Sequence, residues 1–294
     1  MPQSWLQLSI RAAKRDLEIL SNYMIEQGSP GIVLKNGGVD GFFLSSRRDA
    51  ALKSQVERFV SARTDKARLE WNIVQPQDWE HSWKRFIKPA RIGRNFWVTP
   101  PWLKQPKFRR RRIITIEPGM AFGTGTHATT RSCIELLEIV AAKNTGNKWS
   151  VLDVGTGSGI LAIAARILGA TKIWAIDNDP VAVKVARDNL RFNGMGSAIT
   201  LSGEKLGSIR RRFTVVIGNL TGETIIELAE TLQARVAGHG YLILSGILHS
   251  KSQNVLRRFA KSFFVLQRRR KREWVGLLLQ RKCYPLCPGF FYRK

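Results

Sequence analysis

Cysteine, histidine and acidic residues are all scarce in this chain of 294 residues. The three cysteines, Cys133, Cys283 and Cys287, are too few for a disulfide framework, which favours a reducing cytoplasm. The four histidines have no Cys or Asp partners at ligand spacing, so we expect no metal site. No apolar run approaches the roughly 20 residues of a membrane span. The residues from Met1 to Trp5 do not begin a basic region followed by an apolar stretch, which is the pattern of a secretory signal peptide. We therefore expect neither a secretory signal nor contact with a membrane.

The shortage of acidic residues makes the chain strongly basic. It carries 48 Lys and Arg against 22 Asp and Glu, a net charge of +26. The net charge is +12 over residues 1–112, +1 over residues 113–200 and +13 over residues 201–294. Basic flanks of this kind attract polyanions, so contact with ribosomal RNA is one expectation and a solvated surface is the other. The run Arg109–Arg112 has the same two interpretations.

A glycine motif follows a predicted buried strand near the middle of the chain. Its pattern is Asp-x-Gly-x-Gly-x-Gly, from Asp153 through Gly155, Gly157 and Gly159, and a helix rich in Ala, Ile and Leu is predicted from Ile160. Glycines let the backbone approach a ligand that a Cβ would exclude. The dinucleotide fingerprint is Gly-x-Gly-x-x-Gly, whereas this pattern resembles the motif of methyltransferases that use S-adenosylmethionine. An ordinary tight turn is the alternative.

Polar residues end two further predicted strands. Asp177 follows the strand Lys172–Ile176, where a carboxylate can accept hydrogen bonds from ribose hydroxyls. The alternative role of helix cap suits Asp179 better, because proline comes next. Asn219 lies at the carboxyl end of the strand 213–220. Because ligands bind at the carboxyl ends of parallel strands, Gly155, Asp177 and Asn219 should converge on one crevice.

A loop rich in glycine and threonine precedes the motif. It runs from the strand at Ile113 to a helix that begins near Thr129. Its amides and hydroxyls suit a polar ligand, and the helix start offers free N–H groups to a carboxylate such as that of a methionine tail.

The predicted organisation has four parts. Residues 1–75 show a βαββαβ order, which predicts a small ferredoxin-like α+β domain. Residues 76–112 are a linker rich in tryptophan, and residues 113–282 form a Rossmann-like α/β domain. Residues 283–294 are a loosely held tail with Cys283 and Cys287. The linker tryptophans, which we expect to pack the domain junction, are Trp79, Trp83, Trp97 and Trp102.

Taken together, five segments resemble the PrmA family, bacterial methyltransferases of large-subunit ribosomal protein eleven. These segments are 117–130, 152–163, 175–180, 218–220 and 244–248. The Phe-Gly-Thr-Gly-Thr-His loop is their specific part, since many methyltransferases share the glycine motif. The resemblance covers about residues 1–282 and implies a class I S-adenosylmethionine-dependent methyltransferase domain behind a substrate-gripping N-terminal module.

The resemblance also implies an activity and a set of site residues. The activity is methylation of lysine ε-amines and the N-terminal α-amine of that ribosomal protein. We expect the protein to act in the cytoplasm and as a monomer. Asn219 would orient the amine, and His127 is a candidate helper. Glu117 departs from the family's usual Asp, and the high charge and the tail also depart from the family. The implied cofactor contacts are Phe122, Gly123, Thr124, His127, Thr130, Gly155, Gly157, Asp177 and Asn219.

Three other functions compete with this one. An RNA methyltransferase acting on ribosomal or transfer RNA would explain the basic flanks, but Asn219-Leu220-Thr221-Gly222 is not the Asn/Asp-Pro-Pro-aromatic motif of many such enzymes. A non-catalytic RNA-binding protein would not need the glycine, Asp177 and Asn219 set. A dehydrogenase using NAD is disfavoured by the glycine pattern.

Overall fold

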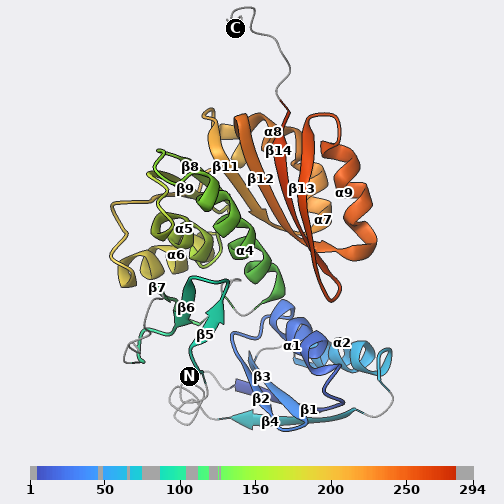
Figure 1. Ribbon diagram of the computed structural model, residues 1–294. Coiled ribbons are helices and arrows are strands. Elements are labelled where there is room, and N and C mark those ends of the chain that lie inside the picture. Colours follow the sequence, from blue (N-terminus) through green and yellow to red (C-terminus); the bar gives the residue numbers. More distant parts are fainter. Residues whose placement is uncertain are drawn as a thin grey trace, which may run out of the picture. The chain divides into compact units, whose positions relative to one another are not determined.

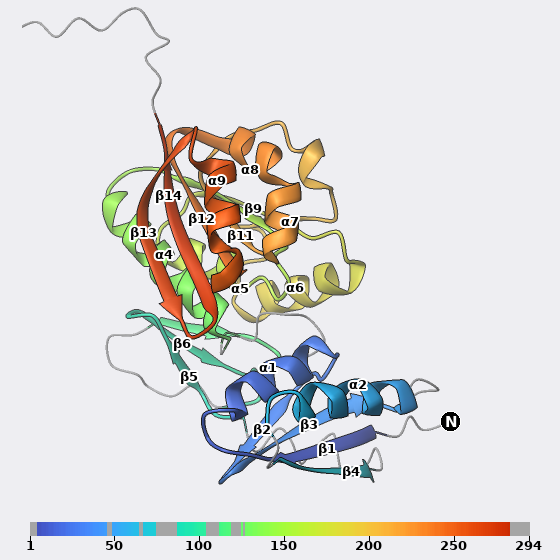
Figure 2. The ribbon, with the colours of Figure 1, turned by 90° about the vertical axis from the view of Figure 1, so that its right-hand side faces the viewer.

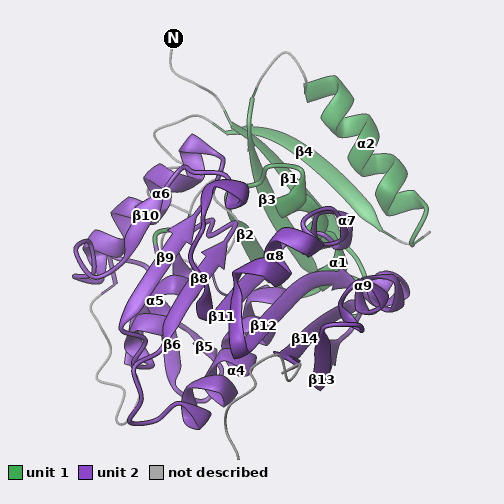
Figure 3. Cartoon of the chain, turned by 90° about the horizontal axis from the view of Figure 1, so that it is seen from above, with its two compact units in different colours: residues 1–89, 117–122 green, residues 90–116, 123–294 purple. Residues whose placement is uncertain are grey.

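The computed structural model describes residues 5–45, 49–64, 67–74, 87–103, 112–118, 125 and 127–282. The chain divides into two compact units (Figures 1 and 3). Unit 1 comprises residues 1–89 and 117–122, and unit 2 comprises residues 90–116 and 123–294. No helix within the described ranges is long and apolar enough to cross a membrane. The expectations about Trp79, Trp83, Arg109–Arg111 and the tail 283–294 fall outside the described residues.

Unit 1 has the element order βαββαβ and an antiparallel sheet with the strand order β2-β3-β1-β4. Alternate residues of β1, from Leu6 to Ile10, point to one face and are buried with α1 and α2. The helices contribute Leu20 and Met24 from α1 and Val56 and Val60 from α2. The elements are β1 (Trp5–Arg11), α1 (Leu17–Glu26), β2 (Ile32–Lys35), β3 (Gly38–Leu44), α2 (Asp49–Ser61) and β4 (Arg68–Val74).

Unit 2 is built on a seven-stranded sheet with the order β10-β9-β8-β11-β12-β14-β13. The five strands β10, β9, β8, β11 and β12 run parallel to one another, and β14 is antiparallel to both of its neighbours. The strands are β8 (Ser150–Val154), β9 (Lys172–Ile176), β10 (Thr200–Ser202), β11 (Phe213–Asn219), β12 (Val236–Leu248), β13 (Phe263–Lys271) and β14 (Trp274–Arg281).

Helices cover both faces of this sheet (Figures 1 and 2). One face packs against α4, α5 and α6, and the other against α7, α8 and α9. Central strands are therefore apolar throughout: Val151 enters one core and Leu152 the other. The helices are α4 (Ala128–Lys143), α5 (Ile160–Ile167), α6 (Pro180–Phe192), α7 (Gly222–Glu227), α8 (Ala229–Arg235) and α9 (Ser252–Phe259).

Part of the predicted linker is instead a small sheet of unit 2. The strands β5 (Ala90–Ile92), β6 (Phe96–Thr99) and β7 (Arg112–Thr115) form it, in that order. Ile92, Phe96, Val98 and Ile114 enter the same core as α4. Strands of three or four residues are too short to show an alternating hydrophobic pattern, so the sequence alone does not predict them.

The final hairpin carries a run of basic residues, 268–272. Strand β13 runs to Lys271, which pairs with Trp274 of β14. Only Arg272, at a φ of +55°, lies in the turn with Glu273. Cross-strand pairing thus places most of the basic run on a strand.

Candidate functional site

Four neighbouring strands of unit 2 end at the same edge of the sheet. Val154 of β8 pairs with Ile176 of β9 and with Gly218 of β11. Asn219 in turn pairs with Ser245 of β12. The next residues after these pairs, Gly155 and Asp177, therefore lie beside Asn219 at one carboxyl edge, as the sequence predicts.

The glycine turn after β8 requires residues without a side chain. Gly155, Gly157 and Gly159 have φ values of +67°, +54° and +80°, a region that disfavours other residues. A Cβ on Gly155 would also lie 2.5 Å from Cδ2 of Leu220. The N–H groups of Gly155 and Thr156 both donate to the Ile176 carbonyl, at 2.9 and 3.0 Å, which fixes the turn against β9.

The Asp177 carboxylate lies against this turn. Its Oδ2 accepts from the Gly157 N–H at 2.9 Å, and its Oδ1 accepts from the Asp179 N–H at 3.1 Å. A carboxylate has about four acceptor positions, so Asp177 can still accept from two hydroxyls. Asp179 caps α6 through the Val181 N–H at 2.8 Å, with Pro180 in the first turn. Capping therefore belongs to Asp179, and Asp177 faces the glycines.

The loop before α4 is described only at Gly125 and His127. The implied contacts Phe122, Gly123 and Thr124 lie outside the described residues. Gly125 has a φ of +88°, and a Cβ there would lie 2.8 Å from Ile92 Cδ1 and 2.9 Å from Ile160 Cδ1. Ile160 is the first residue of α5, so Gly125 lies beside the end of the glycine motif.

His127 is the N-cap of α4. Its Nδ1 accepts from the Thr129 N–H at 3.3 Å and lies 2.7 Å from Thr129 Oγ1, and its ring meets Trp274 edge-on at 5.4 Å. Burial lowers the pKa of His127 to about 4, so the imidazole is neutral near pH 7. A group with so low a pKa is a weak proton acceptor.

Two buried polar atoms lie on the elements that meet here. Thr130 Oγ1 and Asn219 Oδ1 have no hydrogen-bond partner among the described residues. Buried unpaired polar atoms are costly, so such a group suggests a polar ligand. Sequence reasoning missed a further buried contact here, the hydrogen bond between Ser245 of β12 and the Cys133 thiol of α4.

Asp153 is a second residue whose role was not predicted. It is fully buried in β8, and the Thr156 hydroxyl donates to its Oδ2 at 2.7 Å. Burial raises the pKa of Asp153 to about 7, and the negative charge of Asp177 adds to this rise. The signal in the sequence is an acid inside an otherwise apolar strand.

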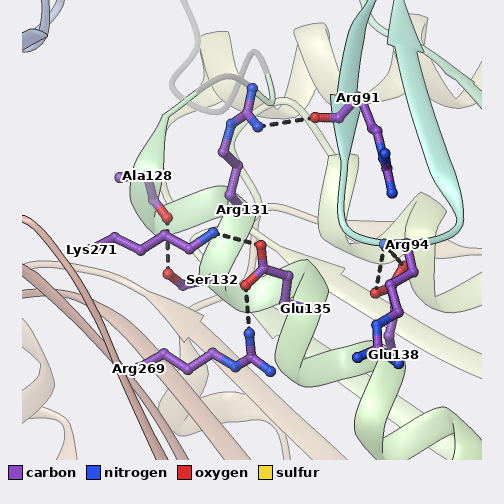
Figure 4. A network of polar contacts seen from close by, with 9 residues as sticks. All are labelled: Arg91, Arg94, Ala128, Arg131, Ser132, Glu135, Glu138, Arg269 and Lys271. Carbon is purple, nitrogen blue, oxygen red and sulfur yellow. Dashed lines mark hydrogen bonds and ion pairs between the residues drawn. The ribbon is translucent and has the colours of Figure 1, made fainter.

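Helix α4, which carries His127 and Thr130 at its start, is fixed by carboxylates further along (Figure 4). Glu138 Oε1 accepts from the backbone N–H groups of Arg94 and Asn95, at 2.9 and 2.8 Å, in the turn between β5 and β6. Gly93 in that turn has a φ of +56° and no room for a Cβ beside Glu138.

The same helix holds the β13–β14 hairpin. Glu135 accepts from Arg269 at 2.8 Å and from Lys271 at 2.5 Å, both on β13 (Figure 4). Gly276 of β14 lies so close to α4 that a Cβ would be 2.9 Å from Ser132 Cβ. Two hairpins far apart in the sequence therefore set the position of the helix that begins at the site.

Comparison with known proteins identifies relatives over most of the chain. The family model described as ribosomal protein L11 methyltransferase (PrmA) matches residues 34–282. A ribosomal protein L11 methyltransferase from Citrifermentans bemidjiense is 35% identical, covering 93% of this chain and 97% of that protein. One from Geobacter sp. strain M21 is 36% identical, with the same coverage.

A solved structure adds support for the fold. The crystal structure of a ribosomal protein L11 methylase from Lactobacillus delbrueckii subsp. bulgaricus is similar with a TM-score of 0.60 and 31% identity. The similarity covers 67% of this chain and 100% of that one.

Proposed function

Because the chain belongs to the ribosomal protein L11 methyltransferase (PrmA) family, we propose that it methylates lysine ε-amines and the N-terminal α-amine of ribosomal protein L11. S-Adenosylmethionine is the methyl donor that the family uses. The observation that carries the proposed site is the hydrogen bond between Gly157 and Asp177 at the carboxyl edge of the sheet.

The residues at this edge fit that cofactor. We assign the ribose hydroxyls to the remaining acceptor positions of Asp177 and the adenosine to the backbone of the glycine turn, residues 155–157. The unpaired Thr130 Oγ1 and Asn219 Oδ1 suit the polar amino-acid tail. When bound, the cofactor supplies a methyl group on a positively charged sulfur, which an amine attacks in line.

The protein must align an uncharged amine. A free lysine has a pKa of about 10.4, so its proton must leave before attack. Asn219 Oδ1 is a buried acceptor that can hold an amine N–H and so orient the nitrogen lone pair. The lowered pKa of His127 argues against a role as proton acceptor, and we propose that it anchors the loop by capping α4.

Unit 1 is the proposed substrate-recognition module. Its strand order β2-β3-β1-β4 and its βαββαβ connectivity support the ferredoxin-like assignment. Folds of this kind bind many ligands, so the recognition role rests on the family and not on the topology.

The substrate is tested by incubating the protein and labelled S-adenosylmethionine with separated ribosomal protein and RNA fractions. We expect label in L11, and mass spectrometry would place it on lysines and the N-terminus. Label in the RNA fraction alone would overturn the proposal and favour an RNA methyltransferase.

The site is tested with Asp177→Asn, which keeps the shape and removes the charge. We expect calorimetry to show an affinity for S-adenosylhomocysteine weaker by roughly 10-fold or more, because charge-assisted hydrogen bonds contribute about 1.5–3 kcal/mol. Asp188→Asn is the matched control, since Asp188 lies on α6 and pairs only with Arg191 among the described residues. Equal affinities in both variants would refute the assignment of Asp177.

A further inference from the structure

Positive charge is concentrated near the end of unit 2. Residues 251–282, which include α9, β13 and β14, contain seven arginines, four lysines and one acidic residue, Glu273. The proposed methylation site lies on other strands and uses none of these cations.

Some of the cations serve the fold. Arg269 and Lys271 pair with Glu135, and Lys251 pairs with Glu223. In residues 251–282, four of the exposed arginines form no ion pair with a described carboxylate: Arg257, Arg258, Arg268 and Arg270. Their charge is therefore not neutralised by neighbouring carboxylates.

Helix α9 is joined by hydrogen bonds to strand β13 at its start and to the residue that follows β14 at its end. At its start, Arg268 donates to Ser252 Oγ at 2.7 Å and lies 3.3 Å from His249 Nδ1. At its end, Lys282 Nζ donates to the Ala260 carbonyl at 2.8 Å. Anchored cations lose less freedom when they bind a ligand.

Apolar side chains are exposed on the same strand. Phe264 is 58% exposed and Val265 is 52% exposed. Lys282 Nζ lies 5.1 Å from the centre of the Phe264 ring. β13 is the last strand in the order of the sheet, so one side of its backbone has no partner strand among the described residues.

We propose that this basic edge, made of Arg257, Arg258, Phe264, Arg268, Arg270 and Lys282, binds single-stranded RNA. Guanidinium groups bind phosphates in a bidentate manner, and the exposed Phe264 ring, on the opposite face of the same edge strand and beside Lys282, is a stacking surface for a base. The open backbone of β13 can hydrogen-bond 2′-hydroxyl groups. A membrane is a poorer partner, because the apolar side of α9, with Val255 and Phe259, is buried in the core. The proposal does not depend on the methylated substrate.

Fluorescence anisotropy with a labelled single-stranded RNA of about 12 nucleotides tests the proposal on the full chain. For a single strand, log K changes with log salt by about −0.7 for each phosphate contact. In Arg257→Gln/Arg270→Gln we expect weaker binding and a salt slope shallower by about 1.4. Lys148→Gln/Lys172→Gln removes two exposed cations elsewhere in unit 2 and should leave affinity and slope unchanged.

Phe264→Ala separates stacking from charge. We expect an affinity weaker by roughly 5-fold or more with an unchanged salt slope, since stacking on an aromatic contributes about 1–3 kcal/mol per base. Thermal unfolding and S-adenosylhomocysteine binding should match the parent protein in all variants.

Equal loss in the Lys148/Lys172 control, equal affinity for DNA of the same sequence, or an unchanged affinity in Phe264→Ala would overturn the proposal. So would tighter binding to anionic vesicles or acidic peptides.

Discussion

At Gly155, backbone conformation and side-chain space impose the same requirement. A residue with a Cβ costs about 1–2 kcal/mol at a φ of +67°, and here the Cβ would also meet Leu220. The turn cannot relax freely, because its N–H groups are bonded to Ile176.

We expect Gly155→Ala to lower the affinity for S-adenosylhomocysteine by at least about 10-fold, since about 1.4 kcal/mol is tenfold in binding. Calorimetry measures this loss. Gly146→Ala is the matched control, because Gly146 has a φ of +81° with no atom within 4 Å of the added Cβ. If both variants bind equally well, strain alone explains Gly155 and the turn does not contact the ligand.

The raised pKa of Asp153 makes stability depend on pH. The pKa of Asp153 in the folded state, about 7, lies above the ordinary value of 3.8. Between these two pH values the folded state therefore binds more protons than the unfolded state. The free energy of unfolding should therefore fall as pH rises through this window, by up to about 1.4 kcal/mol per unit.

Asp153→Asn removes that titration while keeping the shape of the side chain. We expect the melting temperature of the variant, relative to the parent protein, to rise between pH 5 and pH 7 and to level off above pH 7, as calorimetric scans would show. Thr156→Val, which removes the hydroxyl that donates to Asp153, should not flatten the pH dependence. A constant difference between Asp153→Asn and the parent would contradict the raised pKa.

At the scale of elements, contacts with two hairpins fix the position of α4 and therefore of its first residues, which lie at the site. Its carboxylates receive backbone and side-chain donors from residues 94–95 and 269–271. Hydrogen bonds to a charged group contribute about 1.5–3 kcal/mol each when intact.

Glu138→Ala should lower the melting temperature by about 2–6 °C and weaken S-adenosylhomocysteine binding, because the helix start loses its support. Glu227→Ala is the control: Glu227 is exposed in the last turn of α7 and forms no side-chain hydrogen bond or ion pair among the described residues. Unchanged cofactor affinity in Glu138→Ala would show that α4 is held by its apolar side alone.

The elements around the site were largely predictable, and the local pattern explains why. Asp177 and Asn219 each end an apolar strand, so their place at the carboxyl edge followed from parallel pairing. The hydrogen bond between Ser245 and Cys133 depends on the packing of α4 against β12, which no local pattern contains. The pKa of Asp153 depends on complete burial, and β5, β6 and β7 depend on a core supplied by α4.

At the scale of the whole molecule, unit 1 and unit 2 have separate cores. Leu8 and Met24 lie in one cluster, whereas the site lies beside the two clusters that flank the seven-stranded sheet. A ligand at 100 times its Kd stabilises the part that binds it by about 2.7 kcal/mol.

Hydrogen exchange on the full chain should reveal this difference. With S-adenosylhomocysteine we expect slower exchange in β8, β9 and β11 and no change in β1 to β4. Adding L11 should then slow exchange in unit 1 if that unit recognises the substrate. Protection of β1 to β4 by the cofactor alone would contradict a site at the carboxyl edge of the unit 2 sheet.

Leu220 is packed between two glycines, Gly155 and Gly246, and this limits which substitutions these positions can accept during evolution. A Cβ on Gly155 would strike the Leu220 side chain, and a Cβ on Gly246 would strike the Leu220 backbone. Substitutions at the three positions should therefore be epistatic: a smaller residue at 220 relieves the clash of alanine at 155, leaving only the cost of its positive φ, but does not relieve the clash at 246. A library that varies one position at a time would record both glycines as equally intolerant and miss the partly compensated pair.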